Sequence, residues 1–205
     1  MIHVAIVEDD PTWLSLMTDY LGKHNDILVV ATALSREEAI SLSEQALDIH
    51  VILMDVNLSG NFFDGINAAL HFYENTDIKV VMLTAYSDKD LITNSFSAGA
   101  CNYISKDNYQ DIPAAIRHAY RGPNPMDVLL DEFRTMREQC LVNELSASER
   151  EILGLAKEGL SRSQMQQKTF KSDNTIKSQI SSILKKMQVG TLHEAVQRIK
   201  RRGVQ

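Results

Sequence analysis

The stretch VILMD at residues 51–55 is a short apolar run that ends on a carboxylate. Similar apolar runs occur within residues 1–121 at positions 4–7, 28–31, 80–83 and, more weakly, 103–104. Near-continuous apolar runs are typical of parallel strands that are covered on both faces. Between them, apolar residues recur at helical spacing, beginning near residues 13, 35, 66, 91 and 112. Five strand–helix units predict an α/β fold with a doubly wound, five-stranded parallel sheet.

Polar residues stand where the predicted strands end. Two acids follow the first run, one acid ends the third, a threonine ends the fourth and a lysine follows the fifth: Glu8, Asp9, Asp55, Thr84 and Lys106. Ligands bind at the carboxyl ends of the strands in such sheets. Three carboxylates repel one another, and Mg²⁺, which favours carboxylates, waters and phosphate, relieves the repulsion. Any one of these residues alone is an ordinary loop or surface residue, so the prediction of a site depends on their combination.

Asp55 at this edge is a candidate nucleophile that forms an aspartyl phosphate. The metal ion and the ammonium group of Lys106 then neutralise charge on the transferring phosphoryl group. We therefore predict that Asp55 is phosphorylated.

These residues lie within longer motifs, namely IVEDD at 6–10, VILMDVNL at 51–58, DG at 64–65, VVMLTAYSD at 80–88 and SAGACNYISKD at 97–107. Through these motifs, residues 1–121 resemble the receiver domain of two-component response regulators, which has a flavodoxin-like fold. The resemblance implies that a sensor histidine kinase phosphorylates Asp55.

The resemblance also implies roles for the surrounding residues. Glu8 and Asp9 correspond to the acidic pair, with Asp9 the direct Mg²⁺ ligand, and the backbone carbonyl of Asn57 completes the metal site together with Asp55. Lys106 corresponds to the lysine that contacts the phosphate.

Thr84 and Tyr103 correspond to the switch pair. Phosphorylation adds about −1.5 to −2 charges and new acceptor oxygens at neutral pH. The Thr84 hydroxyl turns toward these oxygens, and Tyr103 then rotates into the vacated space. Without the motif, Tyr103 would be interpreted as a half-exposed strand residue.

One loop departs from the family pattern. Ser59-Gly60 stands where a proline is common, and Asp64-Gly65 arrives about two residues late. The loop at 59–63 is therefore longer, and its Phe62 and Phe63 either pack down or contact a partner.

Charge separates the chain into two parts. Residues 1–143 contain 9 Lys+Arg and 21 Asp+Glu, a net charge of −12, whereas residues 144–205 contain 12 and 6, a net charge of +6. This asymmetry predicts a second domain that binds a polyanion. We assign a receiver domain to residues 1–121, a linker with helical character to 122–143, where Gly122–Pro125 stops the preceding helix, and an all-α domain to 144–205.

The bulk composition is typical of a globular protein, with 44% apolar and 23% charged residues. No apolar run reaches the about 18–20 residues of a membrane span, and the N-terminus has the pattern of a strand, not of a signal peptide. Cys101 and Cys140 lack metal or redox spacing. We expect a cytoplasmic protein without a membrane partner.

Residues 144–205 are predicted to form four short helices. Ser146 and Glu149 form a capping box for the first, Gly159 ends it, and Ser172 caps the third. The buried stripe of the third helix comprises Ile176, Ile180, Ile183, Leu184 and Met187. Its opposite face carries Lys177, Ser178, Ser181, Ser182 and Lys185. From the pattern alone, this face is either a solvated surface or a DNA-binding surface, in which lysines neutralise phosphates and short polar side chains reach base edges.

Three motifs distinguish the solvated surface from the DNA-binding surface. They are LSASEREILGL at 145–155, EGLS at 158–161 and SDNTIKSQISSILKKMQV at 172–189. They resemble the LuxR/NarL-type helix-turn-helix of transcription regulators. The resemblance implies a recognition helix at about 173–187 and DNA contacts by Lys177, Ser178, Ser181, Ser182 and Lys185.

This domain also departs from its family. Gln166 stands where a small residue is preferred, Thr169 and Lys171 stand where apolar residues are usual, and Gln179 replaces a common histidine. Looser packing between the two helices is therefore expected. The cluster at 200–202, Lys-Arg-Arg, is either a further phosphate contact or a solvated tail.

Together these features predict a response regulator that binds promoter DNA as a homodimer when Asp55 is phosphorylated. Its catalysis would be limited to its own phosphoryl transfer and dephosphorylation. One alternative is a phosphorylation-controlled protein-interaction module with a degenerate helix-turn-helix. A hydrolase with an aspartyl-phosphate intermediate is disfavoured, because such enzymes commonly have a second acid two residues after the nucleophile, where this chain has Asn57.

Overall fold

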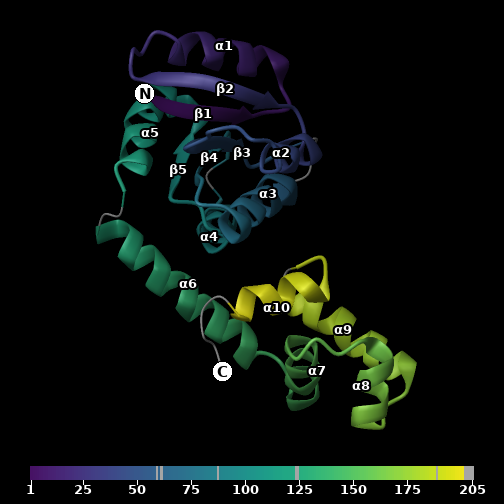
Figure 1. Ribbon diagram of the computed structural model, residues 1–205. Coiled ribbons are helices and arrows are strands. Elements are labelled where there is room, and N and C mark those ends of the chain that lie inside the picture. The colour runs from purple at the N-terminus through teal and green to yellow at the C-terminus, as the bar shows by residue number, and fades with distance from the viewer. Residues whose placement is uncertain (59, 61, 87, 123–124, 188, 201–205) are drawn as a thin grey trace. The chain divides into compact units, whose positions relative to one another are not determined.

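The computed structural model describes residues 1–58, 60, 62–86, 88–122, 125–187 and 189–200 (Figure 1). Contacts between residues divide the chain into two compact units, 1–130 and 131–205, and each is described by itself. Among the described helices, none is long and apolar enough to cross a membrane.

The first unit is a five-stranded parallel sheet with the order β2-β1-β3-β4-β5 (Figure 1). The strands are β1 (Ile2–Val7), β2 (Ile27–Ala33), β3 (Val51–Asp55), β4 (Lys79–Thr84) and β5 (Asn102–Ser105). The helices are α1 (Pro11–Leu21), α2 (Arg36–Leu42), α3 (Phe62–Asn75), α4 (Lys89–Ser97) and α5 (Ile112–Tyr120), with a 3₁₀ segment, η1 (Lys106–Asp111), before α5. The predicted doubly wound fold is confirmed.

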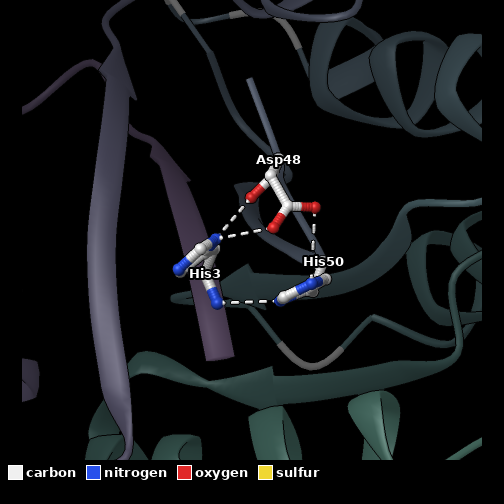
Figure 2. Close-up of side chains that lie close together, drawn as sticks. All are labelled: His3, Asp48 and His50. Atoms are coloured by element: carbon white, nitrogen blue, oxygen red, sulfur yellow. Dashed lines mark hydrogen bonds and ion pairs between the residues drawn. The ribbon is translucent and has the colours of Figure 1, made fainter. Parts of the chain in front are cut away.

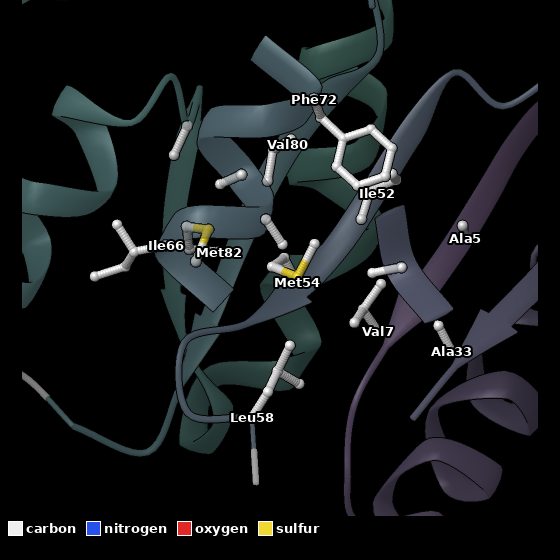
Figure 3. Packing of buried hydrophobic residues seen from close by; sticks show 14 of the residues in the cluster. Ala5, Val7, Ala33, Ile52, Met54, Leu58, Ile66, Phe72, Val80 and Met82 are labelled. Carbon is white, nitrogen blue, oxygen red and sulfur yellow. The ribbon is translucent and has the colours of Figure 1, made fainter. Parts of the chain in front are cut away.

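The central strand β3 shows why the apolar runs are nearly continuous. All five of its residues are buried, and successive side chains point to opposite faces of the sheet. Ile52 and Met54 belong to the cluster that α2, α3 and α4 cover, where Phe72 of α3 packs (Figure 3). Val51 and Leu53 belong to the cluster that α1 and α5 cover. Because both faces are covered, the first four residues of β3 are all apolar, and the one polar residue, Asp55, stands at its carboxyl end.

Helix starts in the first unit follow local capping. Ser35 caps α2, since its side chain accepts a hydrogen bond from the Glu38 backbone N–H at 3.2 Å. The Glu38 carboxylate, however, accepts from the Leu34 N–H at 2.7 Å, so the reciprocal bond lies one residue earlier than in a capping box.

The remaining helices are α6 (Pro125–Asn143), α7 (Ala147–Lys157), α8 (Arg162–Thr169), α9 (Asp173–Met187) and α10 (Leu192–Lys200). The Ser146–Glu149 capping box is present, and Gly159 follows α7 with a φ of 84°. Residues 122–143 contain α6, which runs through the division at 130–131. The predicted domain boundaries at 121/122 and 143/144 remain predictions.

The core of the second unit is formed by α7, α8, α9 and α10. It contains the stripe of α9 that the sequence predicts, with Ile176, Ile183 and Met187 buried. Ile180 is only partly buried and packs against this core. A small helical core of this kind leaves the other face of α9 for solvent or a ligand.

Candidate functional site

Parallel pairing brings the predicted polar residues of the first unit to one edge of the sheet. Asp55 pairs with Leu83, so Thr84 lies one residue beyond it on β4. Thr84 in turn pairs with Ser105, so Lys106 follows directly on β5. The carboxyl ends of β1, β3, β4 and β5 therefore present one constellation, as expected for a ligand site in this fold.

Lys106 joins the two buried acids of this edge. Its Nζ atom lies 2.8 Å from Asp55 Oδ2 and 2.6 Å from Glu8 Oε2. Glu8 is fully buried and Asp55 is 5% exposed. One ammonium group thus neutralises two carboxylates, and the cluster retains a net negative charge when both are ionised.

The shortage of positive charge affects the pKa values. Burial, with repulsion from Asp55, raises the pKa of Glu8 to about 7 despite the hydrogen bond from Lys106. Burial alone would lower the pKa of Lys106, but hydrogen bonds and charge interactions with Asp55 and Glu8 raise it overall. Lys106 therefore stays cationic, and the raised pKa of Glu8 reflects a site that lacks a second positive charge.

The acidic cluster fits a hard cation. Carboxylate oxygens of Glu8, Asp9 and Asp55 lie within 4.8 Å of one another. Asn57 N–H donates to Asp55 Oδ1 at 3.2 Å, and Asn57 Oδ1 is buried without a hydrogen-bond partner among the described residues. Oxygen ligands of this number and charge suit Mg²⁺. The adjacent Asp10 has a different role, since its side chain caps α1 through the backbone N–H groups of Thr12 and Trp13.

Trp13 and Gly65 lie near the site, and the sequence analysis assigns neither a role there. Lys106 Nζ lies 4.7 Å from the ring centroid of Trp13, a cation–π arrangement. A Cβ atom at Gly65 would lie 1.9 Å from the Asp55 carbonyl oxygen. The glycine that arrives two residues late in the sequence therefore lets α3 approach the end of β3. Ser59, Asn61 and the Phe62 side chain lie outside the described residues. Phe63 is exposed in this structure and does not pack down, and a partner contact at this loop stays a prediction.

The predicted switch residues also meet. Thr84 is buried, and its hydroxyl accepts a hydrogen bond from Tyr86 N–H at 2.9 Å. The Tyr103 hydroxyl donates to the Tyr86 carbonyl at 3.1 Å, and its ring is partly buried against the core. Burial raises the pKa of Tyr103. Tyr103 is thus partly buried and bonded near Thr84 in this structure, and the rotation expected on phosphorylation stays a prediction.

In the second unit, α9 presents four of the five predicted DNA contacts to solvent. Lys177, Ser178, Ser181 and Lys185 are exposed. Lys177 pairs with Asp173 at 2.8 Å in this structure.

Ser182 differs from the other four residues. It is half-buried, and its hydroxyl donates to Glu149 Oε1 at 2.6 Å. Glu149 Oε2 accepts from Ser146 N–H at 2.6 Å and from Lys186 Nζ at 2.7 Å. These bonds lower the pKa of Glu149 to about 2, with the Lys186 bond contributing most. The Ser182 hydroxyl thus binds α9 to α7 in this structure rather than facing outward.

The residues that depart from the helix-turn-helix pattern are accommodated individually. Thr169 Oγ1 donates to the Met165 carbonyl at 2.8 Å, and Lys171 Nζ donates to Glu151 Oε2 at 2.6 Å. Gln166 is half-buried. Gln179 Oε1 is buried without a hydrogen-bond partner among the described residues. Arg201 and Arg202 lie outside the described residues, as does the side chain of Lys200.

Comparisons with known proteins agree with this geometry. Residues 4–117 match the family model described as response regulator receiver domain, and residues 143–199 match bacterial regulatory proteins, luxR family. The chain is 30% identical over 203 residues to the transcriptional regulatory protein LiaR of Bacillus subtilis, with 95% of both chains covered. It is also 30% identical over 200 residues to the response regulator protein VraR of Staphylococcus aureus, with 95% of this chain and 94% of VraR covered.

Solved structures share the fold. A structure of RcsB from Salmonella enterica serovar Typhimurium, bound to promoter rprA in the presence of phosphomimetic BeF3⁻, has a TM-score of 0.53 and 20% identity, with 97% of this chain and 99% of that chain covered. The signal receiver domain of the response regulator NarL from Mycobacterium tuberculosis has a TM-score of 0.55 and 21% identity, with 60% of this chain and 98% of that chain covered.

Proposed function

Because the chain belongs to the response regulators that join a receiver domain to a LuxR-type helix-turn-helix domain and regulate transcription, we propose that Asp55 is its phosphoryl acceptor. The observation that carries the proposal is the Asp55 carboxylate at the sheet edge, bonded to Lys106 and grouped with Glu8 and Asp9. The donor is a phosphohistidine of a sensor kinase. The P–N bond breaks as the bond between phosphorus and a carboxylate oxygen of Asp55 forms.

Each neighbouring residue has a part in this transfer. Glu8, Asp9, Asp55 and the Asn57 backbone carbonyl would hold Mg²⁺, which supplies charge neutralisation for the transferring group. Lys106, already bonded to Asp55, contributes a fixed positive charge beside the phosphoryl oxygens. The negative charge of the product then offers acceptors to the Lys106 ammonium and the Thr84 hydroxyl.

Thr84 and Tyr103 carry the signal outward. When Thr84 turns toward the phosphoryl group, it gives up the hydrogen bond from Tyr86 N–H. The Tyr103 hydroxyl donates to the carbonyl of the same residue, Tyr86. The Thr84 hydroxyl then no longer holds Tyr86, and Tyr103 keeps its position beside the core. Phosphorylation thus shifts the population of a conformation that the unmodified chain already samples, and the shift is limited by the difference in interaction free energy between the two states.

The output is sequence-specific binding of double-stranded promoter DNA by α9. Lys177 and Lys185 neutralise phosphates, while Ser178 and Ser181 are short enough to reach base edges. The RcsB structure with its promoter supports this use of the fold. Two copies of the chain bind two half-sites, because dimeric helix-turn-helix proteins read two-fold operators. Catalysis stays confined to phosphoryl transfer and hydrolysis at Asp55, since Asn57 supplies no second acid.

Incubation with acetyl phosphate and Mg²⁺ tests the acceptor. The wild-type chain should gain the mass of one phosphoryl group in a base-labile form, whereas Asp55→Asn gains none. Asp19→Asn, which changes an exposed acid of α1, is the matched control and should label like wild type. Retained labelling of Asp55→Asn excludes Asp55 as the acceptor.

A second candidate output is protein binding by α9 in place of DNA binding. Two features of the helix-turn-helix favour it. Gln179 Oε1 of α9 is buried without a hydrogen-bond partner among the described residues. In α8, Met165 is the one described residue that is buried. Titration of the full chain with random duplex DNA at low and high salt distinguishes the two outputs, because binding through phosphates weakens steeply with salt. Absence of DNA binding at low salt, with and without phosphorylation, would favour the protein-binding output.

A further inference from the structure

Two histidines and an aspartate lie together at the end of the sheet opposite Asp55. His3 is in β1, and His50 immediately precedes β3, so both stand where their strands begin. Glu8 and Asp55 stand where the same strands end. The chain between α2 and β3 contributes Asp48. Topology alone therefore separates this cluster from the acidic cluster by the length of the sheet.

We propose that His3, Asp48 and His50 bind a divalent transition-metal ion of the Zn²⁺ type. Two imidazole nitrogens and one carboxylate oxygen form a donor set that Zn²⁺ favours and that Mg²⁺ does not. In Figure 2 the two rings and the carboxylate point toward one another, and a ligand atom from each lies within 4.8 Å of the others. The proposal is independent of the phosphorylation of Asp55.

The distances are close to those that a metal ion requires. His3 Nδ1 lies 3.1 Å from Asp48 Oδ2, and His50 Nε2 lies 3.5 Å from Asp48 Oδ1. Ligand atoms around tetrahedral Zn²⁺ are separated by about 3.3 Å, given bonds of about 2.0–2.1 Å. The rings are stacked, with centroids 5.1 Å apart and planes at 16°. Each imidazole therefore lies near a different oxygen of the same carboxylate, and the two rings would tilt toward each other to share one ion.

Hydrogen bonds fix the protons of the metal-free cluster. His3 Nδ1 donates to the Asp48 carbonyl at 2.9 Å, so its proton is on Nδ1. His50 Nδ1 accepts from the His3 backbone N–H at 3.0 Å, so its proton is on Nε2. In the neutral rings, both nitrogens that face the carboxylate therefore carry a proton.

Metal binding requires a shift of both tautomers without net proton release. The His3 proton moves to Nε2, and the His50 proton moves to Nδ1, which gives up the bond from the His3 N–H. Loss of this bond opposes binding. We therefore expect the His3 amide to report on binding.

An ion can reach the cluster from solvent. The side chain of Asp48 is 76% exposed, and those of His3 and His50 are 27% and 25% exposed. Tyr120 of α5 lies beside His50, with the two ring centroids 4.8 Å apart. The two histidines are thus partly buried beside β1 and α5, whereas the Asp48 carboxylate is exposed to solvent.

Zinc titration of the full chain by calorimetry, in excess Mg²⁺ to fill the acidic cluster, tests this site. The wild type should bind one ion, with a Tm that rises with Zn²⁺ concentration, and Co²⁺ should give a visible absorption band of a site with imidazole ligands. Asp48→Asn, at an exposed position that should not impair folding, and His3→Gln should weaken binding about tenfold or more.

His118→Gln is the matched control, because His118 is an exposed histidine of α5 outside the cluster. It should bind Zn²⁺ like wild type. Equal affinity of wild type, Asp48→Asn and His3→Gln, or a loss of binding in His118→Gln alone, overturns the proposal. So does a wild-type His3 amide resonance that does not move on addition of Zn²⁺.

Discussion

Each unit of the molecule contains a buried glutamate that is bonded to a lysine, yet the pKa values of the two glutamates shift in opposite directions. The pKa of Glu8 is raised to about 7 and that of Glu149 is lowered to about 2. Glu8 shares Lys106 with a second acid, Asp55. Glu149 shares Lys186 only with a neutral backbone carbonyl, that of Glu144, and also accepts from the Ser146 N–H and the Ser182 hydroxyl.

This difference shows how the surroundings of one residue type decide its role. The cluster around Glu8 has too little positive charge for its acids, and a cation bound there would supply it. The cluster around Glu149 is saturated with donors, and it fixes α9 on α7. The first arrangement is suited to chemistry and the second to holding a binding surface in place.

The largest effect is expected from Glu149→Ala. The substitution removes three hydrogen bonds and leaves a partly buried ammonium group without its partner, which should lower the free energy of unfolding of the second unit by about 3 kcal/mol or more. Denaturant unfolding followed by circular dichroism measures the loss. Glu151→Ala is the control, because Glu151 bonds Lys171 but is half-exposed, and it should cost no more than about 1 kcal/mol. Similar losses in both variants would remove the distinction drawn for Glu149.

A glycine in each unit offers a second comparison. Gly65→Ala forces a methyl group against the Asp55 carbonyl and should destabilise the first unit by about 1–3 kcal/mol. Gly154→Ala adds a methyl group to an open position of α7 and should stabilise the second unit by about 0.5–1 kcal/mol. Thermal unfolding of the two variants distinguishes these signs, and a neutral Gly65→Ala would show that α3 can shift without cost.

The smallest effect is a pH dependence of opposite sign in the two units. In metal-free protein, the raised pKa of Glu8 contributes stability that is present below pH 4.5 and is lost as pH rises through about 7. The lowered pKa of Glu149 contributes stability that is present above pH 4.5 and is lost as pH falls through about 2. Fluorescence of Trp13, the single tryptophan, reports on the first unit, and helical circular dichroism includes the second.

Two variants test which residue causes each pH dependence of stability. Glu8→Gln should flatten the dependence between pH 5 and 7, and Glu149→Gln should flatten the dependence below pH 4.5. An unchanged fluorescence midpoint across pH 5–7 in the wild type would contradict the assignment to Glu8.

Much of the fold follows from the sequence, because apolar runs and capping residues are local features, and helical spacing repeats with the turns of a helix. The buried run of β3 and the acid that ends it predict both a parallel strand and a site at its end. Once the strand order is known, the convergence of Asp55, Thr84 and Lys106 is a consequence of pairing.

Features that depend on tertiary packing were not predicted. Helical spacing places Ser182 on the face opposite the buried stripe, and only the position of α7 decides that its hydroxyl bonds Glu149. The sharing of Lys106 between two acids depends on side-chain geometry. His3 and His50 are far apart in sequence and meet because β1 and β3 are neighbours.

We propose that phosphorylation of Asp55 controls DNA binding by α9. The most direct test is the affinity of the full chain for a DNA site selected from random sequence, measured with and without acetyl phosphate and Mg²⁺ in wild type and Asp55→Asn. We expect at least a tenfold gain in affinity, about 1.4 kcal/mol, in the wild type and no change in Asp55→Asn. The same response in both proteins, or no response in phosphorylated wild type, would contradict it.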